Sequence, residues 1–457
     1  MKLTKFSKFF LLLFMSSSLF AQEEPATSEY NFSLEEAIRF GLENNYNSLN
    51  AESDVEIALK QKWEIISQGL PQITGDVDYQ NFLKQPVTLI PAEITGGEPG
   101  TFVPVTFGTK QSMNATATWN QLIFDGSYIV GVQSAKTLLQ ISKNAKTKTD
   151  HQVKTAIINA YGNVLLAEES VEILQKNLET LQKNYDETKV IYENGMAEQE
   201  DVEQLEITLL GLKNNLNRSI RMRKVAKDLL NITLGLPVET EVNLTQQLDK
   251  LAMQYFDISL LQKEIPVEEN IDYRIAQNTA ESKEIQVKLE KAKALPKLTG
   301  FVNYGYQGYS DDFSFLKSDQ EYFNQSILGV SLDIPIFSSG MRSSRTQQKK
   351  IEYKQALLDL EQTENEVKRR IISAKSEYEY SLENYQTQKK NLELAERIER
   401  KNEVKFFEGL ASSFELSEAQ RQLYSAQQDF LQSMLDVITT KVELENLLDT
   451  TKYSDEK

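Results

Sequence analysis

Two long amphipathic stretches, residues 128–193 and 341–407, constrain the fold more than any other feature of the sequence. No proline interrupts the first stretch, in which apolar residues recur at alternating steps of three and four. Its seam consists of Val153, Ile157, Ala160, Val164, Ala167, Val171, Leu174, Leu178, Leu181, Tyr185, Thr188 and Tyr192. This heptad period is typical of helices that supercoil around one another. A helix over this stretch would be on the order of 100 Å long, which indicates a rod-like or tubular assembly.

Each long stretch ends in a short turn that contains one glycine. The turns are Asn194 to Ala197 and Glu408 to Ala411, and each precedes a second helix. The return helices keep an apolar seam, formed by Val202, Leu205, Leu209, Leu212 and Leu216 after the first turn and by Leu416, Ala419, Leu423, Ala426 and Phe430 after the second. Two helical hairpins are therefore expected.

A pair of alternating segments precedes each long helix. Residues 73–83 and 111–124 alternate apolar and polar side chains. In the second pair, Val302 and Tyr304 match Val77 and Tyr79, and the following strand is predicted over 326–337. Residues 84–110 hold four prolines and four glycines, which favours a long exposed loop. Aromatic side chains suited to a membrane–water interface would lie on one face and polar side chains on the other: Tyr79, Trp119, Tyr304 and Tyr306 against Asp76, Asp78, Asn120 and Asp333.

The same order of elements occurs twice. Leu70-Pro71 and Leu295-Pro296 each end a helix and open a strand, and Ile123-Phe124 parallels Ile336-Phe337 at the end of the second strand. The predicted organisation is a signal peptide 1–21 followed by two repeats. The first repeat, 22–265, has a helix, a β-hairpin 73–124, a long helix 128–193, a return helix 198–234 and an equatorial segment 235–265. The second repeat, 266–457, has a helix, a β-hairpin 298–337, a long helix 341–407, a return helix 412–449 and a C-terminal tail.

Composition excludes several classes of function. The net charge of −17 argues against a nucleic-acid partner. The chain has no cysteine and one histidine, His151, which is expected to be an ordinary helix residue. No metal-ligand spacing, phosphate-binding loop or nucleophile elbow is present, so neither an enzyme nor a cofactor is expected.

The N-terminus is typical of an exported protein. Lys2, Lys5 and Lys8 precede a short apolar run and a small residue, Ala21. The run is too short for a membrane helix, and no later stretch reaches 18 apolar residues. Four strands with one apolar face are too few to close around a lumen, and an open sheet edge is untenable in lipid. Three chains would supply twelve strands, an even number within the range known for outer-membrane barrels.

These features together resemble the TolC family of outer-membrane efflux channels. The motifs that carry the resemblance are the two Leu-Pro strand openings, the Ile-Phe strand-to-helix junctions, and the two turns with an acidic residue six positions after the glycine. The resemblance implies a mainly α protein: a long coiled-coil α-barrel protomer that carries four strands of a shared, trimeric, twelve-stranded transmembrane β-barrel. It also implies a Gram-negative outer-membrane location in contact with lipid. The implied partners are two further copies, a periplasmic adaptor protein and an inner-membrane pump of the RND or ABC type.

The resemblance also assigns roles to single residues. Acidic positions after the turns would line a periplasmic aperture and favour cations; here they hold Asp201, Glu415 and Glu418. Where well-studied members close the aperture with a Tyr and an Arg, this chain has Phe406 and Ala411, so hydrophobic packing by Phe406 is expected instead. Tyr192, at the end of the first seam, is assigned to the same aperture. The turns would be the adaptor-docking tips, formed by Gly195, Met196, Ala197, Gly409, Leu410 and Ala411.

The predicted function is passive conduction of substrates that an inner-membrane pump delivers through the adaptor. Two alternatives stay open at this point. An exit duct for type I protein secretion has the same architecture. A coiled-coil envelope protein without a pore would not need the two β-hairpins.

Overall fold

The computed structural model describes residues 30–263 and 267–448, so the predicted signal peptide lies outside the described residues. Two compact units are distinguished, and each takes segments from both halves of the sequence. One comprises residues 30–48, 151–263 and 374–446 within the described ranges, and the other comprises 49–150, 267–373 and 447–448. We call them the tip unit and the sheet unit. The division into two sequence repeats stays a prediction, because the compact units do not follow it.

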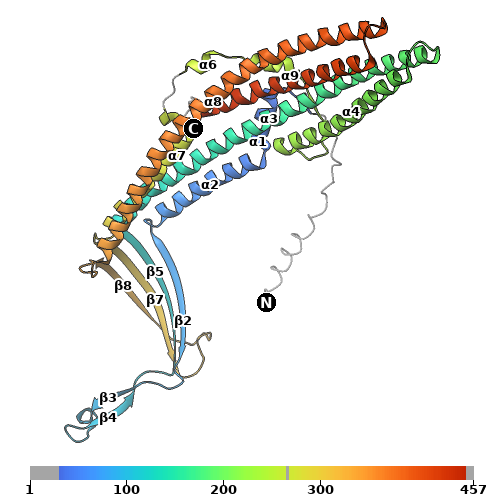
Figure 1. Cartoon of the computed structure of the whole chain (residues 1–457). Helices are drawn as coiled ribbons and strands as arrows, with labels where there is room; N and C mark the ends of the chain where they lie inside the picture. The colour runs from blue at the N-terminus through green and yellow to red at the C-terminus, as the bar shows by residue number, and fades with distance from the viewer. Residues whose placement is uncertain (1–29, 264–266, 449–457) are drawn as a thin grey trace. The chain divides into compact units, whose positions relative to one another are not determined.

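The tip unit is built on two helical hairpins. The first joins α3 (Gly126–Glu193) to α4 (Gln199–Leu234), and the second joins α8 (Met341–Phe407) to α9 (Ser413–Leu447). In Figure 1 the four helices of this unit follow one another in the order α8, α9, α3, α4. Hydrogen bonds join the two hairpins, including Asn177 Nδ2 to Gln427 Oε1 at 2.7 Å. The heptad patterns therefore predicted both long helices and both return helices to within a few residues.

Short elements complete the tip unit. Strand β1 (Tyr30–Phe32) pairs in parallel with β6 (Val242–Leu244), a pairing that the sequence analysis missed. The fully buried Tyr161 of α3 donates its hydroxyl to the carbonyl of Phe32 at 3.0 Å. Burial raises the pKa of Tyr161 to about 12, so this hydroxyl stays protonated. Helices α5 (Leu248–Gln254) and α6 (Ser259–Gln262) lie in the segment predicted as equatorial.

The first helical segment is broken at Asn45. Helix α1 (Leu34–Asn44) begins with a capping box, in which Ser33 N–H donates to Glu36 Oε2 at 2.9 Å and Glu36 N–H donates to Ser33 Oγ at 3.4 Å. Asn45 then leaves the helical conformation, with φ −64° and ψ 133°, and α2 (Tyr46–Ser67) follows. The side chain of Asn45 accepts a hydrogen bond from the N–H of Asn47 at 2.8 Å, which stabilises the new helix start.

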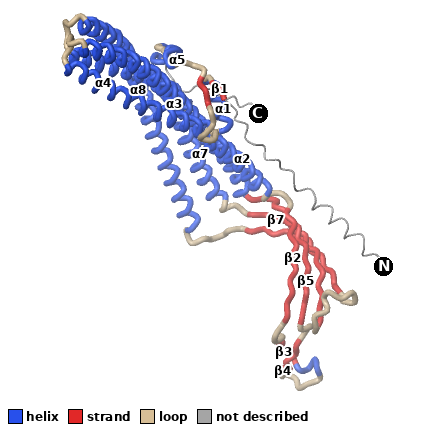
Figure 2. Tube along the Cα trace, turned by 90° about the vertical axis from the view of Figure 1, so that its right-hand side faces the viewer, coloured by secondary structure: helices blue, strands red, loops and turns tan. Residues whose placement is uncertain are grey.

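The sheet unit holds one four-stranded antiparallel sheet in the order β2-β5-β7-β8 (Figure 1), whose strands are red in Figure 2. Its strands are β2 (Gln72–Asn81), β5 (Gln111–Asp125), β7 (Lys297–Ser310) and β8 (Tyr322–Asp333). Helix α7 (Ile271–Ala292) follows the short η2 (Val267–Glu269) and leads into β7. Strands β2 and β8 form the two edges, and neither has a second partner within the described chain.

Two predictions about the sheet unit were wrong. Residues 84–110 are not an irregular loop, because β3 (Val87–Pro91) and β4 (Phe102–Thr106) pair around the 3-10 turn η1 (Ala92–Thr95). The Glu93 carboxylate accepts a hydrogen bond from the Gly100 N–H at 2.8 Å and closes this turn. The proline and glycine content concealed two short β-branched runs.

The last strand also differs from its predicted range of 326–337. It begins four residues earlier and ends at Asp333. Pro335 lacks the N–H that a ladder requires, and its carbonyl instead accepts a hydrogen bond from Arg342 Nη1 at 2.7 Å. The side chains of Ile336 and Phe337 are highly exposed, so the alternation that suggested a longer strand does not reflect sheet pairing there.

Candidate functional site: two helix tips and a two-faced sheet

The two turns predicted as adaptor-docking tips have the same backbone structure. Gly195 and Gly409 are left-handed, with φ of 73° and 71°. In the first tip the N–H of Gly195 donates to Tyr192 O at 2.8 Å and the N–H of Met196 donates to Ile191 O at 3.0 Å. In the second tip the equivalent bonds run from Gly409 to Phe406 at 3.0 Å and from Leu410 to Lys405 at 2.7 Å. This pair of bonds is the Schellman motif, which satisfies the last carbonyls of a helix and favours glycine.

Each tip presents one large apolar side chain to solvent. Met196 is 76% exposed and Leu410 is 72% exposed, whereas the adjacent Ala197 and Ala411 are half-buried. A cleft of about 570 Å³ lies between the tips. It is lined by Thr188, Ile191, Met196, Ala197, Glu198, Asp201, Phe406, Phe407, Gly409, Leu410, Ala411, Ser412 and Glu415. The structure thus brings most of the predicted aperture and docking residues together; Tyr192, 39% exposed, adjoins this cleft in sequence, and Glu418 lies one turn beyond it on α9.

The acidic residue of the second tip caps its own helix. Glu415 accepts hydrogen bonds from the Ser412 N–H at 2.9 Å and from the Ser412 hydroxyl at 3.2 Å. In return the Glu415 N–H donates to Ser412 Oγ at 3.2 Å, which completes a capping box at the start of α9. These bonds, first the backbone one and then the side-chain one, hold the pKa of Glu415 below its ordinary value. The Ser-x-x-Glu spacing could have predicted this role from the sequence.

The acidic residue of the first tip reaches the second tip. Asp201 Oδ2 accepts from the N–H of Glu198 and Asp201 Oδ1 accepts from the N–H of Ser413, each at 3.4 Å. Ser413 is the first residue of α9, so Asp201 joins the start of one return helix to the start of the other. No local pattern reveals this contact, because the two residues are 212 positions apart.

Phe406 is half-buried and packs against the apolar core of the tip unit. The core residues that it contacts form the cluster Leu181, Leu205, Leu212 and Leu416. Its ring also lies edge-on to Phe407, with centroids 5.4 Å apart. Hydrophobic packing by Phe406 is therefore observed, while its predicted role in closing an aperture stays a prediction. Glu418 forms an ion pair with Arg421, one turn further along α9.

One face of the sheet is mainly aromatic and aliphatic, and the other is mixed, with acidic and amide side chains beside Phe301 and Ile327. Cross-strand register places Ile73, Trp119, Val302 and Leu328 in one row. Because facing residues share a side of the sheet and alternate along each strand, Tyr79, Tyr304 and Tyr306 lie on the same face as Trp119. The hydroxyls of Tyr304 and Tyr306 are 2.8 Å apart. By the same register the predicted polar set Asp76, Asp78, Asn120 and Asp333 shares the opposite face, as the sequence indicated.

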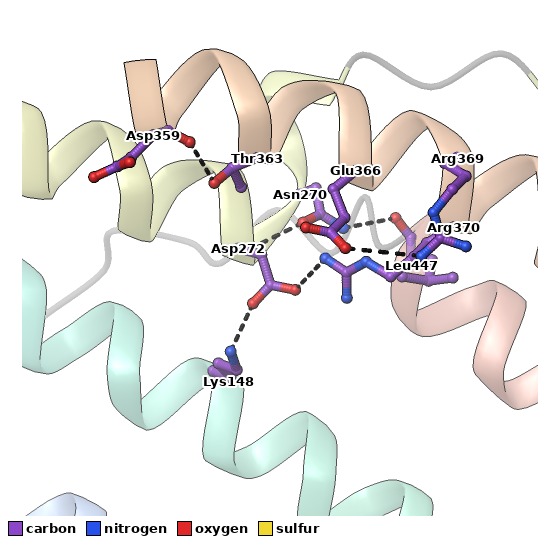
Figure 3. Close-up of polar contacts among 9 residues, drawn as sticks. All are labelled: Lys148, Asn270, Asp272, Asp359, Thr363, Glu366, Arg369, Arg370 and Leu447. Atoms are coloured by element: carbon purple, nitrogen blue, oxygen red, sulfur yellow. Dashed lines mark hydrogen bonds and ion pairs between the residues drawn. The ribbon is translucent and has the colours of Figure 1, made fainter. Parts of the chain in front are cut away.

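The sheet unit also contains an ion cluster that the sequence analysis missed (Figure 3). Asp272, at the start of α7, accepts from Lys148 Nζ of α3 at 2.8 Å and from Arg370 Nη2 of α8 at 2.7 Å. Burial alone would raise the pKa of Asp272, but the hydrogen bonds from the two cations outweigh it and hold the pKa below its ordinary value. Asn270 caps α7 and donates to Leu447 O at 3.1 Å. The cluster joins three helices through one carboxylate.

Within residues 30–263 and 267–448, no helix has the length and apolarity needed to span a membrane. Over the same residues no group of three or more His, Cys, Asp and Glu side chains is arranged to hold a metal ion.

Comparison with known proteins gives consistent results at three levels. Residues 268–450 match the family model described as outer membrane efflux protein. The chain is 22% identical over 356 residues to the outer membrane protein TolC of Vibrio cholerae, covering 75% of this chain and 78% of that protein.

Solved structures show the same fold. VceC of Vibrio cholerae has a TM-score of 0.69 at 15% identity, with 91% of this chain and 95% of that chain covered. The CmeC outer membrane channel of Campylobacter jejuni has a TM-score of 0.71 at 16% identity, with 91% and 85% covered. The MtrE outer membrane channel of Neisseria gonorrhoeae, described in its open state, has a TM-score of 0.70 at 17% identity, with 91% and 88% covered. Together with the paired tips and the two-faced sheet, these matches show that the chain has the fold of the TolC-like outer membrane channels and that residues 268–450 are similar to the outer membrane efflux proteins.

Proposed function

We propose that this protein is the outer-membrane exit channel of a tripartite efflux system. It conducts substrates passively, and an inner-membrane pump delivers them through a periplasmic adaptor. The observation that carries the proposal is a four-stranded sheet with two unpaired edges and one apolar face, in a chain that also has paired helix tips. A coiled-coil envelope protein without a pore has no use for such a sheet.

Three copies supply the missing partners of the sheet. Lipid cannot hydrogen-bond to the exposed backbone groups of β2 and β8, so each edge requires a strand from another copy. Closure of three sheets yields a twelve-stranded barrel, with Trp119, Tyr304 and Tyr306 toward lipid and Asp76 and Asp78 toward the lumen. The trimeric channels of this family provide the precedent for this arrangement.

The tips form the docking surface for the adaptor. Met196 and Leu410 are apolar anchors that remain exposed in the isolated chain, and the cleft between them offers a concave seat. Exposed apolar side chains around a shaped cleft favour a protein partner over solvent. The inner-membrane pump that delivers the substrates is of the RND or ABC type.

The aperture is closed by tip contacts other than a Tyr–Arg latch. The Asp201 carboxylate joins the two tips of one copy by accepting from the N–H groups of Glu198 and Ser413, and Phe406 anchors the second tip in the apolar core. Glu418, which is exposed, faces the aperture with its copies and favours cations. The Glu418→Gln variant should lower cation preference in planar-bilayer recordings, and unchanged selectivity would argue against this placement.

The function is tested on the mature protein purified from outer membranes in detergent. The expected result is a trimer on unheated gels that becomes a monomer on boiling, together with discrete conductance steps in planar bilayers. The matched control is a tip variant, Leu410→Glu, which should retain both properties because it leaves the sheet intact. A monodisperse monomer that stays in solution without detergent contradicts the proposal.

A further inference from the structure

The outer two helices of the tip unit, α8 and α4, each leave one face without a partner among residues 30–263 and 267–448. Figure 1 shows α9 and α3 between them. Ala395 and Phe406 of α8 face the other helices, and so do Leu205 and Leu212 of α4. The opposite face of each helix is solvent-exposed in the single chain.

The free face of α8 near its tip is basic. Arg397, Arg400, Lys401 and Lys405 line a shallow hollow of about 430 Å³ together with Val404, and we call these four cations the basic face. None of the four forms an ion pair within the described residues of the chain, although the protein carries a net charge of −17. Val404 is 52% exposed at the centre of the hollow.

The free face of α4 near its tip has the complementary character. Glu200, Glu203 and Glu206 are exposed and form no ion pair within the described chain, and we call them the acidic face. Ile207 and Leu210 follow on the same side and are 65% and 60% exposed. Exposed apolar residues beside unpaired charges are typical of a surface that another protein covers.

We propose that the acidic face of α4 in one copy packs against the basic face of α8 in the next copy. Both faces lie within the first helical turns above the tips, so neighbouring copies can bring them to similar heights. A ring is built from one heterologous contact that repeats, which requires two different and complementary faces on each copy, as α4 and α8 provide. The inference rests on the proposed trimeric channel and adds the surface that sets the register of its helices.

An acidic partner protein on the basic face alone fits the observations less well. It would leave Ile207 and Leu210 of α4 exposed, whereas a second copy covers the apolar residues and neutralises both sets of charge at once.

The absence of cysteine from the sequence permits a direct test. A Glu203→Cys/Lys401→Cys variant is treated in intact outer membranes with a short bifunctional maleimide. The expected product is a covalent trimer that survives boiling, because each copy offers one cysteine to each neighbour. The single variants Glu203→Cys and Lys401→Cys are the matched controls and should yield no covalent trimer. A double variant that stays monomeric after boiling, or that couples only to a different protein, overturns the inference.

Charge reversal provides a second readout. The Arg400→Glu/Lys401→Glu variant should dissociate into monomers at a lower temperature than the unmodified trimer. Adding Glu200→Lys/Glu203→Lys should restore the dissociation temperature of the unmodified trimer. Salt should reduce the difference in dissociation temperature between the Arg400→Glu/Lys401→Glu variant and the unmodified trimer, since exposed charges are screened over about 10 Å at 0.1 M ionic strength. Failure of the swap to rescue would overturn the pairing. If the unmodified protein forms no trimer, the proposed function is refuted instead, so the two failures are distinguishable.

Discussion

The two tips share a backbone structure, yet their acidic residues have different hydrogen-bond partners. Both end a long helix with a left-handed glycine and the same pair of hydrogen bonds. Six residues after the glycine, Glu415 folds back on Ser412 of its own tip, whereas Asp201 contacts both its own tip and Ser413 of the other. The acidic residue of the second tip therefore bonds only within its own tip, whereas that of the first tip also bonds to the second tip of the same chain.

The cause lies in the residues that begin the two return helices. Ser412 supplies a hydroxyl that accepts the Glu415 N–H, so the second tip satisfies its helix start with two local residues. Glu198 occupies the equivalent position in the first tip and has no hydroxyl, and the Asp201 carboxylate accepts both from the Glu198 N–H and from the Ser413 N–H of the second tip. Residues at matching positions of a duplicated motif thus need not share a function.

The largest expected effect follows from charging the apolar residue at either tip. Met196→Glu and Leu410→Glu each place a carboxylate on a side chain that is exposed and proposed to be buried by the adaptor, so substrate export should be lost while the trimer remains. Export is measured as intracellular accumulation of a fluorescent efflux substrate. Met196→Leu and Leu410→Met serve as conservative controls. If export is lost in only one of the two variants, the two tips contribute unequally to adaptor docking, as they differ in hydrogen bonding. If both variants still export the substrate, the adaptor does not dock on the tips.

An intermediate effect is expected from breaking the link between the tips. Ser413→Pro removes the N–H whose hydrogen bond Asp201 accepts, together with the serine hydroxyl, and proline is well tolerated at the first position of a helix. Asp201→Ala removes the acceptor, and both variants should raise the conductance of the resting channel in planar bilayers. The double variant should resemble Asp201→Ala, which loses both the bond from the Ser413 N–H and the bond from the Glu198 N–H. Additive effects would show that Asp201 acts through a different contact.

The smallest effect concerns the local cap of the second tip. The pKa of Glu415 is lower in the folded protein than its ordinary value of 4.5, so its stabilisation is complete above that pH and is lost as the pH falls through the folded value. Acidification should therefore loosen the start of α9 and speed limited cleavage beside the exposed Phe414 by pepsin, which is active at low pH. In the Glu415→Gln variant this pH dependence should disappear. Equal acid sensitivity of both proteins would assign the effect to another group.

Local patterns in the sequence determined the helices, the tips and the faces of the sheet. Heptad spacing has only one regular solution over dozens of residues, and a glycine between two such helices indicates a left-handed turn. Strand alternation assigned Trp119, Tyr304 and Asp76 to their faces, because the side-chain period of a strand is two. Composition predicted a loop over residues 84–110, which was wrong because the prolines and glycines there accompany a paired β-hairpin.

Only the tertiary structure decided which distant groups meet. The contact of Asp201 with Ser413, the joining of Lys148 and Arg370 by Asp272, and the parallel pairing of β1 with β6 connect residues that are far apart in sequence. Such contacts depend on how helices stack and on the orientation of single side chains, and no periodicity within one segment encodes them. The sequence thus determined the elements and their faces, whereas packing determined the partners of each charge.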